Sequence, residues 1–165
     1  MGSTTSSLEF KALSNPAVLW VTVGGVGFIK PAPGTWGSVV ALILWWFFLA
    51  DLSLPLQAAI ACVYAGLSWA LCAYVCRRFD IDDAPEIVAD EVAGMWLTLM
   101  WLPQVWWIAL IGFALFRLLD ISKPYVIGWL DREVRGAGGV MVDDVVAGLV
   151  AGVVLKVALL LAGLN

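Results

Sequence analysis

Five long apolar stretches occupy most of this 165-residue chain, and they restrict it to folds whose helices can pack within a membrane. The chain is 62% hydrophobic and only 13% charged, far from the composition of a soluble domain. We therefore predict an all-α integral membrane protein, a compact bundle of four to five transmembrane helices that forms a single domain over residues 1–165. The stretches run from Trp36 to Ala50, Leu56 to Cys76, Ile87 to Leu102, Val105 to Leu119 and Val140 to Leu161.

The third stretch, Ile87 to Leu102, decides between four and five crossings. It is near the short end for a transmembrane helix, and it carries Asp90 and Glu91 in its first turns, where charge is costly to place in hydrocarbon. The sequence leaves two alternatives open for this stretch, a full crossing and a re-entrant or tilted helix.

Two further segments are predicted to lie at the membrane surface as amphipathic helices. Leu8 to Val23 forms one of them, with Pro16 near its middle, inside an N-terminal interfacial segment of residues 1–23. Ile121 to Val134 mixes apolar and charged side chains in the manner of an interfacial helix. The sequence before Leu8 lacks the basic and apolar regions of a signal peptide, so we expect the N-terminus to be retained.

The distribution of basic residues predicts which face of the bundle meets the cytoplasm, because Lys and Arg favour that side. If the first apolar stretch starts inside, nearly all basic residues fall inside with it, and only Lys156 departs. The residues placed inside are Lys11, Lys30, Arg77, Arg78, Arg117, Lys123, Arg132 and Arg135.

The formal charge of −4 argues against a nucleic-acid partner, since binding phosphates along a duplex takes clustered cations.

Acidic residues at the ends of apolar helices are the first candidates for chemistry. Asp90 with Glu91, and Asp143 with Asp144, are adjacent pairs, and Asp120 falls at the same predicted membrane face. Buried acids normally face water, a partner or a cation, and hard oxygen ligands suit magnesium. Single acids at helix starts also act as N-terminal caps, but caps require only one acid per helix.

A glycine-rich segment, residues 24–38, precedes the first apolar helix and is the candidate for binding phosphate. Its glycines permit close backbone approach, and N–H groups at the start of the next helix attract phosphate oxygens. A Pro- and Gly-rich turn that simply leads into a membrane helix is an equally good interpretation. The candidate phosphate-binding residues here are Lys30, Gly34, Thr35, Gly37 and Ser38.

The run from Phe116 to Pro124 carries both signs of charge within two helical turns. Arg117 and Lys123 flank Asp120, and the run suits either a phosphate clamp or a salt bridge at the membrane edge. The chain contains no histidine, which excludes phosphatases that use histidine as nucleophile or acid. A carboxylate or a metal-activated water must therefore manage the proton.

At these motifs the sequence resembles the phosphatidylglycerophosphatase A family, over nearly the whole length from about Gly24 to about Gly152. The resemblance implies a magnesium-dependent phosphatase in a bacterial inner membrane that converts phosphatidylglycerophosphate to phosphatidylglycerol. It also implies that the Gly-Thr loop, the Asp-Glu pair, Asp120 with Lys123, and the Asp-Asp pair belong to the active site. The four matching stretches are Pro33–Ser38, Ile87–Met95, Phe116–Pro124 and Gly139–Gly148.

These observations combine into one expected site at the cytoplasmic face. Asp90, Glu91, Asp143 and Asp144 would hold one or two Mg²⁺ ions, and Asp120 would be a further ligand or a general base. The cations Lys30, Arg117 and Lys123 and the amides of residues 34–38 would bind the phosphate. One departure from the family pattern, Asp83-Ala84-Pro85, affects only the local loop.

Several alternatives stay open at this point. The same acids could line a cation transporter or channel, or the helices could form a scaffold packed through Gly148 and Gly152. The sequence decides neither between direct attack by water and an aspartyl-phosphate intermediate nor between one and two metal ions. It also leaves open whether the protein is a homo-oligomer and whether it accepts other phospholipid monoesters.

Overall fold

The computed structural model describes residues 7–81, 84–124 and 137–164, and every regular element within those ranges is helical, as predicted. The side chains of residues 137–140 are outside this description. The elements in chain order are η1 (Phe10–Ser14), α1 (Pro16–Val21), η2 (Val26–Phe28), α2 (Pro33–Leu44), the π-helical η3 (Trp45–Leu49), α3 (Leu54–Phe79), α4 (Ala89–Leu99), α5 (Trp106–Ser122) and α7 (Ala137–Leu161).

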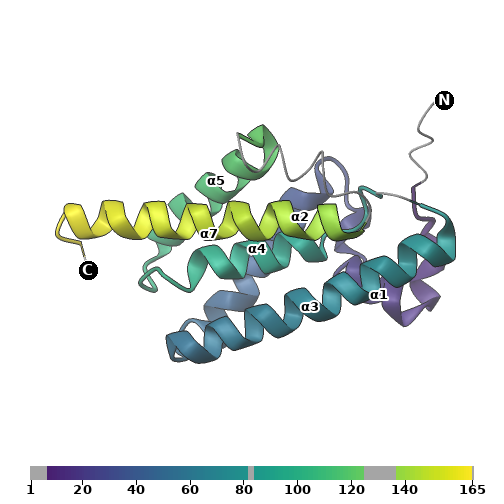
Figure 1. Ribbon diagram of the computed structural model, residues 1–165, viewed down its shortest axis with the longest axis horizontal. Helices are drawn as coiled ribbons and strands as arrows, with labels where there is room; N and C mark the ends of the chain where they lie inside the picture. Colours follow the sequence, from purple (N-terminus) through teal and green to yellow (C-terminus); the bar gives the residue numbers. More distant parts are fainter. Residues whose placement is uncertain (1–6, 82–83, 125–136, 165) are drawn as a thin grey trace.

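Two helices, α3 and α7, extend along most of the length of the molecule (Figure 1). Leu54–Phe79 and Met141–Leu161 are long and apolar enough to cross a membrane, and only 22% and 39% of their most apolar windows are buried. Apolar side chains such as Val63 and Trp69 are largely exposed, which is typical of a surface that faces lipid. The structure thus supports a membrane protein with two candidate spans, while the predicted count of four to five spans stays a prediction.

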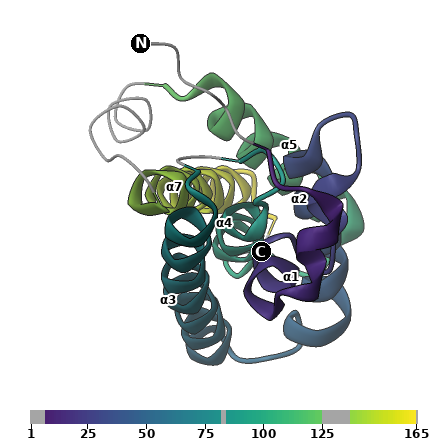
Figure 2. The ribbon, with the colours of Figure 1, turned by 90° about the vertical axis from the view of Figure 1, so that its right-hand side faces the viewer.

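Helix α4 lies at the centre of the bundle, surrounded by the other helices (Figure 2). It has eleven residues, about half of what a membrane crossing needs, and nine of them are buried. Val92, Met95 and Leu99 pack in the main apolar core together with Trp45 and Phe116. The third apolar stretch of the sequence is therefore a short internal helix that is enclosed by protein.

Glycines let α4 and α7 approach at backbone distance. A Cβ atom at Gly148 would collide with the carbonyl of Gly94, and one at Gly152 would lie 2.8 Å from the carbonyl oxygen of Thr98. The Thr98 hydroxyl lies 3.0 Å from the carbonyl oxygen of Gly94 and 3.1 Å from that of Gly148. The Gly148–Gly152 spacing therefore serves helix packing.

The N-terminal segment differs from the prediction of one helix from Leu8 to Val23. It forms two short helices, η1 and α1, because Pro16 begins a helix here where it was expected near the middle of one. Proline suits the first helical turn, where its missing N–H has no acceptor to lose, and the Asn15 side chain accepts from the N–H of Ala17 at 2.9 Å. The segment keeps an exposed face that includes Phe10.

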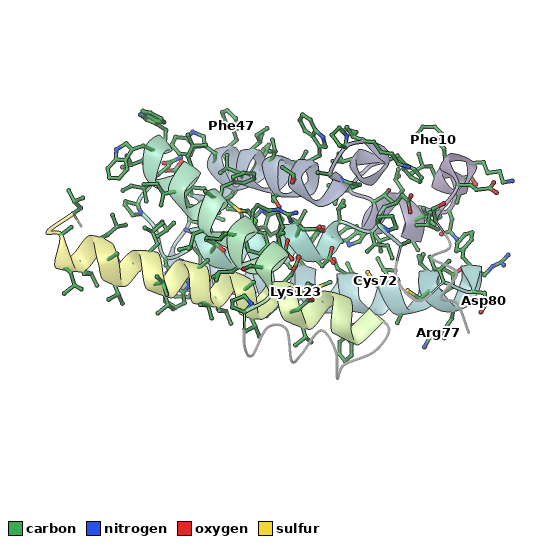
Figure 3. All side chains as sticks on the ribbon, turned by 90° about the horizontal axis from the view of Figure 1, so that it is seen from above. Phe10, Phe47, Cys72, Arg77, Asp80 and Lys123 are labelled. Atoms are coloured by element: carbon green, nitrogen blue, oxygen red, sulfur yellow. The ribbon has the colours of Figure 1, made fainter. Side chains whose placement is uncertain are left out.

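The predicted amphipathic segment from Ile121 to Val134 lies mostly outside the described residues. Its first two residues complete α5, and Lys123, which follows the helix as its C-terminal cap, has a left-handed backbone conformation with φ of 44°. The left-handed residue ends the helix within the run Phe116–Pro124, and Lys123 lies beside α7 (Figure 3).

Candidate active site

A polar cavity of about 310 Å³ lies where four helices meet, at the starts of α2 and α4, the end of α5 and the early turns of α7. Helix packing brings together side chains that are more than fifty residues apart in the sequence. The charged residues that line the cavity were all predicted as site residues from the sequence: Asp90, Glu91, Arg117, Asp120, Lys123, Asp143 and Asp144.

Three of the carboxylates form a compact group. Asp90, Glu91 and Asp144 each offer an oxygen that lies within 4.8 Å of the others. Asp90 and Asp144 are buried, at 6% and 3% exposure, and the Glu91 side chain is 14% exposed. Such a cluster of hard oxygen ligands at the edge of a cavity suits Mg²⁺.

Buried carboxylate oxygens without hydrogen-bond donors also favour a bound cation at this position. Asp90 Oδ1 and Glu91 Oε2 are buried, and neither finds a hydrogen-bond partner among the described residues. A buried carboxylate oxygen without a donor is unfavourable, and three neighbouring carboxylates also repel one another. A cation at this position would relieve both effects, so the residues fit a bound metal ion.

Two cations, Arg117 and Lys123, also line the cavity, and each is paired with an acid. Arg117 Nη1 is 2.6 Å from Asp120 Oδ2 and 3.7 Å from Glu91 Oε1. Lys123 Nζ is 2.7 Å from Asp143 Oδ2. Because the side chains of Arg117 and Asp120 are only about one-seventh exposed, this pair is fixed more firmly than a surface salt bridge.

The balance of charge around the cavity decides what it can bind. Among the residues that line it, five carboxylates face two cations, so the ionised cavity is strongly negative. A phosphate dianion would be repelled from such a cavity, whereas one or two divalent cations would neutralise it and attract phosphate.

Gly34 forms part of the wall at the start of α2, where N–H groups have no partner inside the helix. A Cβ atom at Gly34 would collide with the Glu91 carboxylate and would lie 3.2 Å from Arg117 Nη1. A side chain at this position would therefore displace the Glu91 carboxylate. The absence of a side chain lets the α2 backbone approach the acidic group.

Four of the residues predicted to bind phosphate do not line the cavity. Lys30 is exposed before α2, and Thr35 is half-buried within its first turn. Gly37 packs against Val88, and the buried Ser38 hydroxyl donates to the carbonyl of Gly34 at 2.8 Å. The roles predicted for these residues therefore have no support from the geometry of the cavity.

One wall of the cavity was missed by the sequence analysis. Ala84, Pro85 and Ile87 form it, from the connection between α3 and α4, and Ala32 and Pro33 complete the lining near Gly34. These side chains are small or apolar and carry no chemical signal of their own. The sequence feature that could have pointed to this wall is Pro85, which belongs to the one stretch where the sequence departs from the family pattern.

Fold and site together define a class: a helical, membrane-type protein with an acidic cavity that is suited to a divalent cation and a phosphate group. Comparison with known proteins identifies the family. Residues 19–159 match the family model for phosphatidylglycerophosphatase A. The chain therefore belongs to the phosphatidylglycerophosphatase A family, which confirms the predicted resemblance and the enzyme class of a phosphoric monoester hydrolase.

Individual relatives agree with this assignment. The chain is 39% identical over 145 residues to phosphatidylglycerophosphatase A of Escherichia coli, an alignment that covers 87% of this chain and 83% of that one. It is 36% identical over 149 residues to the Haemophilus influenzae protein of the same name, with 87% and 89% covered. A relative from Bacteroides thetaiotaomicron, 34% identical with 88% and 97% covered, is named provisionally as a phosphatidylinositol-3-phosphatase. No solved structure matches the chain.

Proposed function

We propose that this protein is a Mg²⁺-dependent lipid phosphatase that hydrolyses the terminal phosphate monoester of phosphatidylglycerophosphate to phosphatidylglycerol and inorganic phosphate. The single observation that carries the proposal is the cavity itself, whose wall combines three clustered carboxylates with two cations, Arg117 and Lys123. Family membership supports the substrate, since two relatives bear that activity in their names.

The residues divide into two groups by what they can do. Asp90, Glu91 and Asp144 would hold the metal ion, with Asp143 near enough in sequence to join them. Bound Mg²⁺ would supply positive charge that attracts the phosphate and stabilises the charge developing on it. Arg117 and Lys123 would contact the phosphate oxygens after exchanging part of their contact with Asp120 and Asp143.

Hydrolysis requires a nucleophile and a place for a proton. In one route, water attacks phosphorus, Asp120 accepts the proton of that water, and the same proton passes to the glycerol oxygen as its bond to phosphorus breaks. In the other, a carboxylate attacks phosphorus and displaces the glycerol oxygen, which takes up a proton from water, and a second water later hydrolyses the aspartyl-phosphate to free carboxylate and inorganic phosphate. Phosphate trapped on the protein would identify the second route, and its absence during steady turnover would support the first.

The position of the cavity suits a lipid substrate. Its wall includes the connection that follows α3, whose last turn carries Arg77 and Arg78, and the start of α2, which Lys30 precedes. Basic residues favour the cytoplasmic side, so we propose that the cavity opens to the cytoplasm at the inner membrane of a bacterium. Acyl chains would stay in hydrocarbon beside α3 and α7 while the phosphate reaches the cavity.

A cation channel or transporter is disfavoured by the surroundings of the acids. Beyond Glu91, α4 carries no charged residue through Leu99, and Val92 and Met95 are buried in the apolar core. A cation that entered the cavity would meet no further acid along this helix. The acids therefore lie together at one cavity and form no path through the bundle along α4.

Phosphate release by the purified protein in detergent tests the proposal. We expect release from phosphatidylglycerophosphate with Mg²⁺ and none with EDTA, and an unchanged rate for Asp51→Asn, which removes an exposed acid in the connection before α3. Phosphatidylinositol-3-phosphate and phosphatidic acid, tested in parallel, would show how far the headgroup matters. A well-folded protein that releases no phosphate from any of the three would refute the proposal.

A further inference from the structure

Glu86 is a buried acid that neither lines the cavity nor takes part in the mechanism proposed above. The residue is 3% exposed, and its Oε2 atom accepts a 3.0 Å hydrogen bond from the main-chain N–H of Leu8, which is 78 positions earlier. Burying a carboxylate is unfavourable unless specific donors hold it. Its contact with a distant segment therefore indicates a positional role.

The connection that carries Glu86 has two sides. Its inner side, through Ala84, Pro85 and Ile87, forms the wall of the cavity. It then leads directly into the first turn of α4, which bears Asp90 and Glu91. Any displacement of this connection would therefore displace both the wall and the two acids.

The outer side of the same connection contacts residues 7–28, a range that is called the N-terminal segment from here on. The N–H of Val88 donates to the carbonyl of Val21 at 2.9 Å. A Cβ atom at Gly27 would collide with the carbonyl of Glu86, so the two backbones lie in direct contact there. With the bond from Leu8, three separate contacts join the segment to residues 86–88.

Apolar packing reinforces these contacts on one face of the segment. Leu8, Val18 and Val21 are nearly fully buried in a cluster that also contains Ile87 and Cys72. The other face is exposed: Phe10 is 71% exposed and lies at the edge of the molecule (Figure 3). The segment thus joins the outer surface of the bundle to the connection behind the cavity.

We propose that Glu86 is a positioning residue that fastens the N-terminal segment to the connection before α4 and so fixes Asp90 and Glu91 in the cavity. The contact is independent of any reaction, whereas its consequence for catalysis rests on the proposed function. Glu86 acts through the hydrogen bond from Leu8, and its charge is secondary.

Three variants separate this role from a general loss of stability. Glu86→Leu removes the acceptor and keeps the volume, Glu86→Gln keeps a carbonyl oxygen that can accept from Leu8, and Glu86→Asp keeps the charge but shortens the reach. Glu9→Gln, an exposed acid on the same segment, is the matched control. The variants are made in the full chain with Cys62→Ala and Cys76→Ala, which leave Cys72, 1% exposed, as the reporter thiol.

Three readouts are measured on each variant. The first is the rate at which a maleimide modifies Cys72, which lies beneath the segment. We expect about a tenfold faster rate for Glu86→Leu and Glu86→Asp, because local opening exposes the thiol. The second is kcat with phosphatidylglycerophosphate, and the third is the Mg²⁺ concentration that half-saturates binding, measured by isothermal titration calorimetry. We expect about a tenfold lower kcat and a higher half-saturating concentration, because the acids shift.

Glu86→Gln is expected to stay within about twofold of the parent protein in every readout, since it retains the acceptor. A protein that is merely less stable would lower the unfolding midpoint without moving the half-saturating Mg²⁺ concentration, and that result would overturn the proposal. Equal damage by Glu86→Gln and Glu86→Leu would overturn it as well. If the parent releases no phosphate, the proposed function fails, and Cys72 modification still decides the role of Glu86.

Discussion

Buried polar groups are treated differently in the interior of the bundle and in the cavity. In the interior, the Gln57 amide accepts from Trp45 Nε1 and donates to the carbonyl of Leu52, both at 2.9 Å. The Thr98 hydroxyl likewise lies within hydrogen-bond distance of two carbonyl oxygens. In the cavity, Asp90 Oδ1 and Glu91 Oε2 are buried with no partner in the described parts of the chain.

The difference shows which polar groups serve the fold and which serve function. Groups that stabilise a fold are satisfied by the protein itself, because an unmet donor or acceptor is unfavourable. Polar groups without a hydrogen-bond partner at the edge of a cavity lower the stability of the fold, and they are retained where a bound ligand supplies the missing contact. The indole N–H of Trp101 is an interior exception, buried without a partner among the residues described.

The largest expected effect comes from neutralising one acid of the carboxylate group. Asp144→Asn removes a metal ligand and its charge, so phosphate release should fall about a hundredfold or more. The thermal unfolding midpoint without Mg²⁺ should stay level or rise, because repulsion among the carboxylates decreases. The test is kcat beside a melting curve on one preparation. A fall in midpoint that matches the loss of activity would assign Asp144 to the fold.

Lower stability with little change in activity is expected for Gly148→Ala, which changes the interior contact between α4 and α7. Its Cβ atom would collide with the Gly94 carbonyl, and overpacking of this kind destabilises by about 1–3 kcal/mol. Activity per folded molecule should change little. The control is Gly66→Ala, which meets nothing within 4 Å and should stabilise α3 by about 0.5–1 kcal/mol. Equal unfolding midpoints for the two variants would contradict the close approach.

A smaller effect is expected for Gly34→Ala, which places a methyl group against the Glu91 carboxylate. The side chain can shift aside, so stability should hardly change while kcat falls about tenfold, because one metal ligand is displaced. Kinetics at saturating lipid, with a Mg²⁺ titration, measure this. Activity equal to that of the parent would show that the α2 backbone does not restrict Glu91.

The smallest effect is expected for Ser38→Ala. Its hydroxyl is buried and bound to the Gly34 carbonyl, away from the cavity, and loss of such a bond costs about 0.5–1.5 kcal/mol of stability. The KM for lipid should be unchanged, as measured by initial rates over a range of lipid concentrations. A large rise in KM would support the phosphate-binding role that the sequence predicted for Ser38.

The charged members of the site were predictable from sequence because chemistry marks them. Paired acids such as Asp143 and Asp144 at the starts of apolar helices are conspicuous, and they meet in the cavity as expected. Their meeting depends on topology, since helices that begin or end at one membrane face bring their ends together.

Helix rotation and loop contacts were not predictable. Gly34 and Ser38 are one turn apart, yet only Gly34 reaches the cavity, because the packing of α2 against Val88 fixes its orientation. Glu86 has no distinguishing spacing, and its importance follows only from a contact with Leu8 across 78 residues. The apolar pattern of the third stretch likewise cannot separate a short enclosed helix from a transmembrane one.

The central claim is that Asp90, Glu91 and Asp144 hold a divalent cation, and a Mg²⁺ titration followed by thermal unfolding tests it most directly. The unfolding midpoint should rise with Mg²⁺ in the unmodified protein and in Asp51→Asn, because binding to the folded state stabilises it. It should not rise in Asp144→Asn. The same rise in all three proteins, or no rise in the unmodified protein, would contradict the account.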